Sequence, residues 1–300
     1  MLAPEVTEYI KQAGNKMDAI SDDVDEVNKI KYDEASTFDA GKDKAKFRQY
    51  DDACDRVKNF YAEQHKKQTL AYNLAIRKQV LGKVNARMSV WEALEMLNTL
   101  VDESDPDTSV GQIEHLLQTA EAIRRDGKPD WMQLTGLIHD LGKLLCFFGA
   151  EGQWDVVGDT FVVGCKFPRE IIYPDTFAAN PDSHDPKLQT ELGIYEPHCG
   201  LDNAILSWGH DQYIYEICKA QSTLPKAALS MLRYHSFYPW HREGAYRHLM
   251  NDEDEEQLKA VNAFNPYDLY SKSDSPPVVA ELKPYYQSLI AKYFPAVVEW

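Results

Sequence analysis

The stretch from Asp130 to Leu145, DWMQLTGLIHDLGKLL, constrains this chain most, because it places a histidine and an aspartate side by side at the end of an apolar helix. Its leucine, isoleucine and methionine residues recur at helical spacing. Asp130 is typical of a helix N-cap and Gly142 of a helix end. We therefore predict that His139 and Asp140 leave a buried helix end together, as a candidate pair of metal ligands.

The spacing of this pair limits how it can bind metal. Adjacent residues on a helix point about 100° apart, so His139 and Asp140 share one ion only if the carboxylate reaches across. A carboxylate has two oxygens and can hold two ions at once. A lone His-Asp dipeptide matches by chance too often to define a metal site, so other ligands must support it.

The charge of the chain argues against nucleic acid and anionic membranes as partners. The 300 residues carry a formal net charge of −16, whereas phosphate binding needs clustered lysine and arginine. No stretch approaches the roughly 18 apolar residues of a membrane span, and the N-terminus lacks the pattern of a signal peptide. We expect a monomeric, cytoplasmic protein.

The cysteines indicate neither disulfides nor a zinc site. They are odd in number, widely spread and without CxxC spacing, so we interpret them as reduced thiols. The five positions are Cys54, Cys146, Cys165, Cys199 and Cys218.

Hydrophobic periodicity predicts one mostly helical domain over residues 46–300, preceded by a polar, charged extension over residues 1–45. Ser89 and Glu92 have the spacing of a capping box, and Pro225 and Pro284 fit first helical turns. The helices are predicted over residues 48–84, 89–101, 109–125, 130–142, 211–220, 225–234, 254–264 and 284–294.

Two other segments depart from the helical pattern. Residues 154–165, WDVVGDTFVVGC, have runs of β-branched residues around Gly158 and Asp159, which predict a short β-hairpin. Residues 166–200 are rich in proline, aspartate and asparagine and predict a long ordered loop, which in a compact domain is often functional, for example as a lid.

Further histidines lie near predicted helix ends. A single histidine among apolar residues is more often a hydrogen-bonded core residue than a metal ligand. Here, however, His115 precedes the His139-Asp140 pair, and His210, His235 and Asp268 follow it. Helices that converge on one point would bring these side chains together, so we predict that they form one metal centre.

These residues resemble the H…HD…D signature of HD-domain metalloproteins, with His210 and His235 as the extra pair of members that bind two metals. Longer blocks closely resemble the myo-inositol oxygenase family, in the same order from about Phe47 to the C-terminus. The blocks are DESDPD (102–107), LIHDLGK (137–143), VVGDTF (156–161), WGHDQY (208–213), YHSFYPWH (234–241) and FNPYDLYSK (264–272). The resemblance implies an all-α, HD-domain-like helical bundle around a di-metal site, to which our reading of the residues adds the minor β-hairpin.

The resemblance also implies a reaction and a cofactor. That family cleaves the ring of myo-inositol with O2, in a four-electron oxidation that gives D-glucuronate, at a mixed-valent Fe(II)/Fe(III) centre. One iron would take His115, His139, Asp140 and Asp268. The other would take His210 and His235 and share Asp140 as a bridging ligand. Imidazole and carboxylate ligands without thiolates suit iron or manganese better than a structural zinc site.

The substrate contacts implied by the resemblance suit an uncharged polyol, whose hydroxyls need both acceptors and donors. Lys143 lies one helical turn after His139, where its charge would stabilise a deprotonated substrate hydroxyl, so we expect it to be catalytic. On residue type alone it also fits a solvated helix end. The predicted substrate-binding residues are Arg48, Asp102, Ser104, Lys143, Gly158, Asp159, His235, Ser236 and Lys272.

Two alternatives fit parts of the same pattern. The H…HD…D core also serves metal-dependent phosphohydrolases, where two metals activate water against a phosphate ester. Such a substrate would call for more arginine near the ligands, whereas this chain offers Asp102, Ser104 and Asp159. A binding protein that has lost its metals is the second alternative, but all six ligand positions are present. The oxygenase is therefore favoured.

Overall fold

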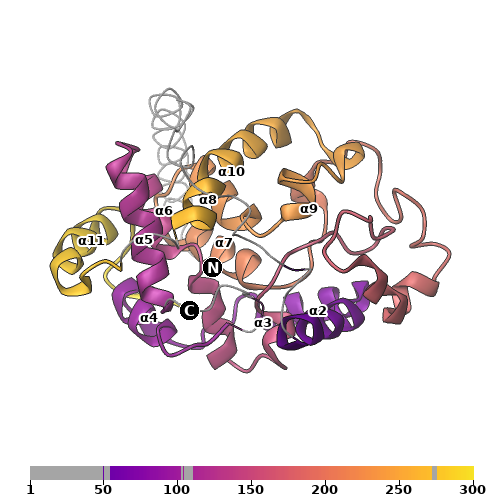
Figure 1. The fold of residues 1–300 in the computed structure, drawn as a ribbon, viewed down its shortest axis with the longest axis horizontal. Helices are drawn as coiled ribbons and strands as arrows, with labels where there is room; N and C mark the ends of the chain where they lie inside the picture. The colour runs from indigo at the N-terminus through magenta and orange to yellow at the C-terminus, as the bar shows by residue number, and fades with distance from the viewer. Residues whose placement is uncertain (1–49, 51–54, 103, 105–110, 272–275) are drawn as a thin grey trace, which may run out of the picture.

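Helices are the main elements of the computed structural model, which describes residues 50, 55–102, 104, 111–271 and 276–300 (Figure 1). The predicted all-α class is confirmed. The α-helices are α2 (Asp55–Lys67), α3 (Leu70–Val80), α4 (Val90–Leu97), α5 (Gln112–Arg125), α6 (Asp130–Ile138), α7 (His210–Gln221), α8 (Lys226–Tyr234), α9 (Tyr238–His241), α10 (Asp252–Tyr270) and α11 (Val279–Tyr293). The predicted extension over residues 1–45 and the predicted substrate-binding residues Arg48 and Lys272 lie outside the described residues.

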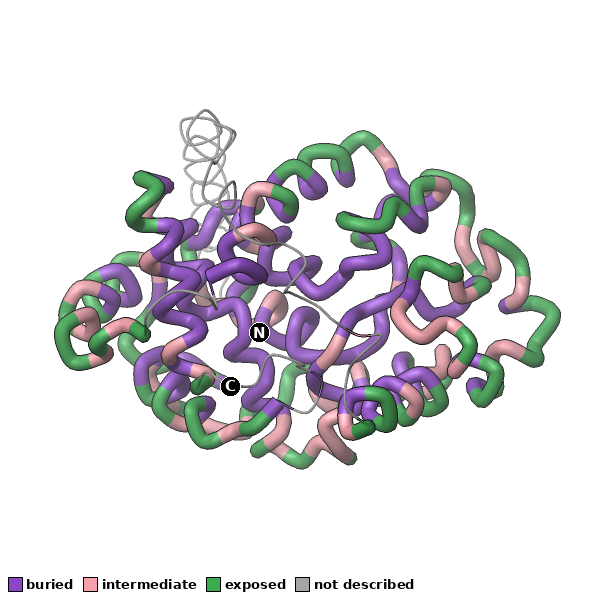
Figure 2. Tube along the Cα trace, viewed as in Figure 1, coloured by how far each residue is buried: buried purple, intermediate pink, exposed green. Residues whose placement is uncertain are grey.

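Helix α6 lies at the centre of the helical core. Every residue from Trp131 to Ile138 is buried, and the helix packs against α5, α8, α10 and α11. Gly136 lets α5 approach closely, because a Cβ atom there would lie 2.8 Å from the Ile123 side chain. Buried segments fill the centre of the molecule and exposed ones form its rim (Figure 2). The predicted pair of ligands therefore follows a helix that is fixed on all sides.

Both predicted ends of this helix are wrong in detail. Pro129, with an extended ψ of 154°, is the N-cap, and Asp130 is the first helical residue. Gly142 does not end the helix, because the chain continues from Leu141 to Phe147 as the 3₁₀ helix η2. The 3₁₀ helix is wound more tightly than α6, and it begins directly after the point where His139 and Asp140 leave α6.

Several other predicted helices need new boundaries. The pattern over residues 48–84 covers two helices, because the Thr69 side chain accepts a hydrogen bond from the Tyr72 amide and starts α3. Pro284 lies inside α11 and not in its first turn. The capping box of Ser89 and Glu92 is confirmed at the start of α4.

The predicted β-hairpin over residues 154–165 is wrong. Residues 153–155 form a 3₁₀ turn, and the extended chain after it pairs with a distant segment, through Val163 N to Ile205 O (2.9 Å) and Ser207 N to Phe161 O (2.7 Å). A short β-branched run indicates burial without identifying the partner strand. The sheet that does form pairs β1 (Arg87–Met88) with β2 (Val298–Glu299), antiparallel.

Residues 166–200 form the predicted long loop, with 3₁₀ turns at Pro174–Ala179 and Pro181–His184. It is attached to the start of the helical domain. The side-chain amide of Asn180 donates to the His65 carbonyl (2.6 Å). An Asp182 carboxylate oxygen accepts from the backbone amide of Leu70 (2.6 Å) at the start of α3. These contacts hold the middle of the loop against α2 and α3. A lid role for the loop stays a prediction.

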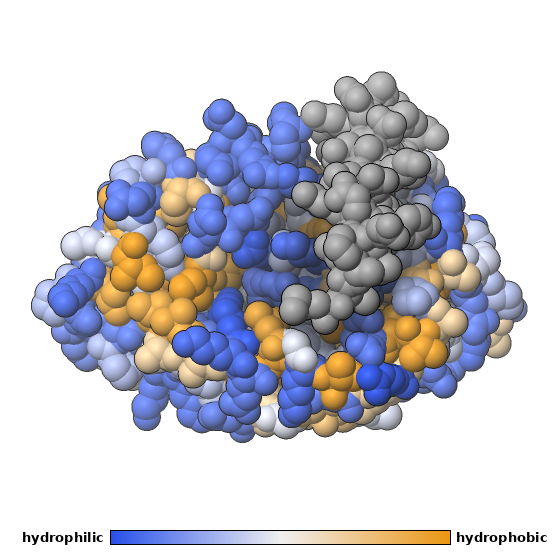
Figure 3. Space-filling view, turned by 180° about the vertical axis from the view of Figure 1, so that it is seen from behind, coloured by the Kyte–Doolittle hydropathy of each residue, from blue (hydrophilic) through white to orange (hydrophobic). Residues whose placement is uncertain are grey.

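The polar character of the surface agrees with the many charged residues in the sequence. Hydrophilic side chains cover much of the face shown in Figure 3, with hydrophobic groups gathered in patches. In the part of the chain that the structure describes, no helix combines the length and apolar character needed to cross a bilayer. The thiols of Cys165, Cys199 and Cys218 are free, and Cys54 lies outside the described residues.

His65 gives the fold a specific sensitivity to acid. Its ring is fully buried, stacks on Phe177 at 4.0 Å between centroids and contacts the Thr176 hydroxyl at 2.6 Å through Nδ1. Burial lowers the pKa of His65 from 6.5 to about 3, and a backbone hydrogen bond with Tyr173 offsets this only partly. Between these pH values the unfolded chain binds a proton that the native protein excludes, so the free energy of unfolding falls as the pH falls.

We predict that His65→Phe flattens this part of the pH dependence. The contribution of His65 amounts to about 2 kcal/mol between pH 7 and pH 5, on the scale of 1.4 kcal/mol per pKa unit. Urea unfolding of wild type and variant at both pH values measures the difference. His184→Gln, at an exposed histidine of the loop that His65 packs against, serves as the control. Equal pH dependence of wild type and His65→Phe would contradict the prediction.

Candidate metal centre

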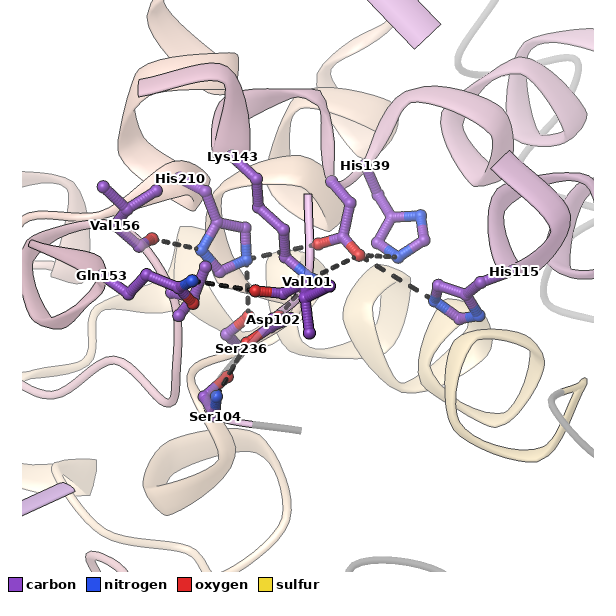
Figure 4. Close-up of polar contacts among 12 residues, drawn as sticks. Val101, Asp102, Ser104, His115, His139, Lys143, Gln153, Val156, His210 and Ser236 are labelled. Carbon is purple, nitrogen blue, oxygen red and sulfur yellow. Dashed lines mark hydrogen bonds and ion pairs between the residues drawn. The ribbon is translucent and has the colours of Figure 1, made fainter. Parts of the chain in front are cut away.

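Five helices bring the six predicted metal ligands together. His115 comes from α5, His139 is the C-cap of α6 and Asp140 follows it. His210 begins α7, His235 is the C-cap of α8, and Asp268 lies in the last turn of α10. Most of these residues lie at helix ends, as the sequence suggested, and none is exposed. Figure 4 shows His139, His210 and Lys143 pointing into a common space.

The two oxygens of Asp140 face two different pairs of histidines. Oδ2 lies 3.5 Å from His139 Nε2 and 3.9 Å from His115 Nε2. Oδ1 lies 3.4 Å from His210 Nε2 and 3.6 Å from His235 Nε2. The carboxylate thus stands between the pairs, in the arrangement of a bridging ligand.

Each pair of imidazoles is closely gathered. Asp268 Oδ1 lies 3.1 Å from His115 Nε2 and 3.2 Å from His139 Nε2, and completes the first group. In the second group, His210 Nε2 and His235 Nε2 are 3.2 Å apart. Separations of about 3 Å are those of neighbouring ligand atoms that each lie about 2 Å from one metal ion.

Backbone carbonyls fix the orientation of three of the imidazoles. The Nδ1 atoms of His139, His210 and His235 lie 2.9, 2.8 and 3.0 Å from the carbonyl oxygens of Gly136, Val156 and Leu232. A carbonyl only accepts, so each Nδ1 carries the hydrogen and each Nε2 directs its lone pair into the centre. Such second hydrogen bonds are typical of metal-ligating histidines.

The side chains present fit metal ions. His139 Nε2 is buried without a hydrogen bond, yet it lies close to oxygens of Asp140 and Asp268. Lone pairs of nitrogen and oxygen at such distances repel unless a cation lies between them. Neither group of candidate ligands among the described residues contains a cysteine. Imidazole and carboxylate ligands of this kind suit iron or manganese.

The buried carboxyl and imidazole groups of the centre shift one another's pKa values. Burial alone would raise the pKa of the Asp140 carboxyl, but Lys143 and His139 outweigh it and hold that pKa well below its ordinary value. His139 and His115 do the same for Asp268. Burial alone would lower the pKa of His139, but Asp140 and Asp268 raise it overall. The electrostatics of the site therefore favour bound positive charge.

Lys143 connects the centre to two predicted substrate-binding residues. Its Nζ lies 2.8 Å from Asp140 Oδ2 and 2.8 Å from Asp102 Oδ2. Asp102 Oδ1 in turn accepts hydrogen bonds from the Ser104 amide (2.8 Å) and hydroxyl (2.6 Å) (Figure 4). Burial would lower the pKa of Lys143, but the two carboxylates hold it well above its ordinary value. The lysine is a buried, permanent cation and not a solvated helix end.

Ser236 lies beside the second pair of histidines, with its hydroxyl oxygen 3.2 Å from His210 Nε2, and the segment that contains Gly158 and Asp159 is attached to it. The Thr160 amide donates to the Ser236 carbonyl at 2.9 Å, and the Val156 carbonyl accepts from both the amide (2.7 Å) and Nδ1 (2.8 Å) of His210. A hydrogen bond of 3.3 Å from the Tyr61 hydroxyl holds Asp159. Of the predicted substrate-binding residues, Arg48 and Lys272 lie outside the described residues.

One buried carboxylate at the centre was not among the predicted residues. Asp211 Oδ1 lies 2.8 Å from His210 Nε2 and 3.4 Å from His235 Nε2. The sequence contains a signal for it, because His210-Asp211 repeats the dipeptide His139-Asp140. The same dipeptide at His184-Asp185 is exposed, so the repeat alone does not separate a site residue from a surface one.

Gly142 lets the two halves of the centre meet. A Cβ atom on this residue would lie 2.0 Å from the carbonyl oxygen of His210, which no rotation of a side chain can relieve. The 3₁₀ helix after the first pair of ligands therefore packs directly on the backbone of the second group.

Comparison with known proteins gives consistent matches. A family model described as myo-inositol oxygenase matches residues 54–300. The inositol oxygenase of Dictyostelium discoideum is 49% identical over 282 residues, which cover 91% of this chain and 97% of that protein. Inositol oxygenase 2 of Arabidopsis thaliana is 55% identical over 249 residues, or 81% and 78% of the two chains. The inositol oxygenase of Danio rerio is 48% identical over 265 residues, or 86% and 95%.

We predict that Gly142→Ala displaces His210 and weakens metal binding. Overpacking of this kind costs about 1–3 kcal/mol of stability, because the added methyl group meets backbone atoms. Urea unfolding measures the stability, and metal analysis of the purified variant measures the bound metal. Gly127→Ala is the control. It strains a residue at φ +69° with open space around it, so it should lower stability but keep the metal. Wild-type metal content in Gly142→Ala would contradict the prediction.

Proposed function

The chain belongs to the myo-inositol oxygenase family, and from that membership we propose that it cleaves the ring of myo-inositol with O2 to give D-glucuronate. The observation that carries the proposal is the position of Asp140, with one oxygen toward each of two histidine pairs. A centre for two metals needs such a shared ligand. Cleavage of an unactivated polyol by O2 in turn needs metal chemistry that protein side chains do not supply.

We propose two iron ions per chain as the cofactor, with O2 as co-substrate. His115, His139 and Asp268 would hold the first iron, His210 and His235 the second, and Asp140 would bridge them. When bound, a mixed-valent Fe(II)/Fe(III) pair supplies the one-electron chemistry that activates O2. The neutral imidazoles and the buried carboxylates support this assignment, because they offer the negative charge and lone pairs that the cations need.

Lys143 would act on the charge of the reacting polyol. It stays protonated between Asp102 and Asp140, and therefore presents a fixed positive charge beside the bridging carboxylate. A substrate hydroxyl that loses its proton next to this ammonium group is stabilised, because the charge is already in place in a site that excludes most water. Asp102, held by Ser104, keeps the lysine oriented.

The other proposed substrate-binding residues offer both kinds of hydrogen-bonding partner. Asp159 supplies an acceptor, and the Ser236 hydroxyl, 3.2 Å from His210 Nε2, supplies a donor and an acceptor next to the proposed second iron. The left-handed backbone of Gly158 (φ +91°) packs against the Phe60 ring, so a side chain there would collide with α2. We extend the proposal to Arg48 and Lys272 from the match to the family blocks.

The phosphohydrolase alternative has less support. In the described part of the chain, the ligand carboxylates contact Lys143 and the histidines but no arginine, whereas a bound phosphate calls for several cations. The similar proteins are named inositol oxygenases.

We further propose that residues 46–300 act as one catalytic domain, in a monomeric, cytoplasmic enzyme.

Reconstitution tests the proposed function. Metal-free protein receives ferrous iron and reductant without oxygen, and then myo-inositol and O2. We expect glucuronate to form in proportion to the O2 consumed. Release of phosphate from phosphate esters, or no turnover at two bound irons per chain, would overturn the proposal.

We predict that Asp140→Ala and Asp268→Ala differ in metal stoichiometry. The first removes a ligand of both ions and should leave fewer than one iron per chain. The second removes a ligand of one ion only and should leave about one. Iron analysis after reconstitution gives both values. Two irons per chain in Asp140→Ala would rule out its bridging role.

We predict that Lys143→Met retains two irons but lowers kcat by about 10²–10³, the range for loss of one charge-stabilising group. Steady-state kinetics and iron analysis of the same preparation separate turnover from metal loss. Lys128→Met, at another buried lysine, is the matched control and should turn over normally. Wild-type kcat in Lys143→Met would show that the lysine has no part in the reaction.

A further inference from the structure

Asp211 is a buried carboxylate whose charge the proposed reaction does not yet use. It lies in the first turn of α7, directly after His210, and only 1% of its surface is exposed. Within the described ranges, no lysine or arginine forms an ion pair with it, and its titratable neighbours are His210 and His235. Burying a carboxylate without a cation is costly, so its position needs a reason.

The two oxygens of Asp211 connect the start of α7 to the end of α8. Oδ2 accepts a hydrogen bond from the Ser236 amide at 3.1 Å, and Oδ1 accepts one from the Ser236 hydroxyl at 3.1 Å. Ser236 directly follows His235, so the carboxylate fixes the spacing between the two histidines of the second group. That spacing is 3.2 Å between their Nε2 atoms.

The position of Asp211 in the second group matches that of Asp268 in the first. Each places one carboxylate oxygen about 3 Å from the Nε2 atoms of two histidines, at 3.1 and 3.2 Å for Asp268 and at 2.8 and 3.4 Å for Asp211. Without Asp211, the second group would have two neutral imidazoles and a share of Asp140. With it, each group has one carboxylate of its own.

We infer that Asp211 is a positioning residue of the second metal site, and that its negative charge strengthens cation binding between His210 and His235. This inference rests on the proposed di-metal function. Asp211 stays hydrogen-bonded to Ser236 and acts from outside the six ligands, by balancing the charge of the second ion and by holding the histidines that bind it. Groups that support ligands in this way typically change metal affinity by 10–100-fold.

Asp211→Asn tests the inference, because the amide keeps the size of the side chain and one acceptor for Ser236 but loses the charge. Metal-free protein is titrated with ferrous iron against a chelator without oxygen. We expect the first equivalent to bind as in the wild type and the second at least tenfold more weakly. Asp254→Asn is the matched control, because Asp254 is equally buried and accepts from the amides of Leu201 and Asn251 away from the centre.

Two further variants separate charge from structure. Ser236→Ala keeps the carboxylate and should bind the second equivalent within threefold of wild type, whereas a loss as large as that of Asp211→Asn would overturn the role of the charge. If metal-free Asp211→Asn fails to melt cooperatively, Asp211→Glu replaces it. Glutamate restores the charge, so two equivalents should bind, and binding of only one would overturn the inference.

The titration also keeps this inference apart from the proposed function. A wild-type protein that binds fewer than two equivalents contradicts the di-metal centre itself. A wild type and an Asp211→Asn variant that both bind two equivalents with equal affinity contradict the inference alone, because the centre then forms without the charge.

Discussion

The structure depends on the cost of burying negative charge. Asp140 lies 4% exposed between four imidazoles and one ammonium group, and Asp268 and Asp211 are similarly enclosed. Such carboxylates are stable inside a protein only when cations and hydrogen bonds surround them closely, since the desolvation cost of an unpaired charge exceeds the gain from most other contacts. The helices that carry these groups therefore have to end at the same place.

That convergence explains several features of the packing. The apolar faces of α5, α6, α8 and α10 form one hydrophobic core, and their ends point toward the metal centre. Small residues permit the approach at its tightest points, namely Gly136 between α6 and α5 and Gly142 against the backbone of His210. Hydrophobic burial thus positions the helices, and the contacts at their ends position the chemistry.

The sequence predicted the class of the fold and the residues that meet in the centre better than it predicted local boundaries. The six candidate ligands could be predicted because each is a residue type that is costly to bury and each lies next to a strong helical pattern. They are His115, His139, Asp140, His210, His235 and Asp268. The hairpin prediction failed because β-branched runs show burial but not pairing, and Val163 finds its partner at Ile205. Asp211 was missed because its contacts with Ser236 depend on how α7 meets α8, which periodicity does not report.

The carbonyls that orient His139, His210 and His235 belong to the main chain of Gly136, Val156 and Leu232. Substituting the side chains at these positions leaves the acceptors in place as long as the local backbone path is kept. The orientation of these three imidazoles thus depends on the path of the backbone and not on any particular neighbouring side chain. Sequence drift of the size seen among the compared proteins, which differ from this chain at about half of the aligned positions, can accumulate around the candidate metal centre without reorienting these imidazoles.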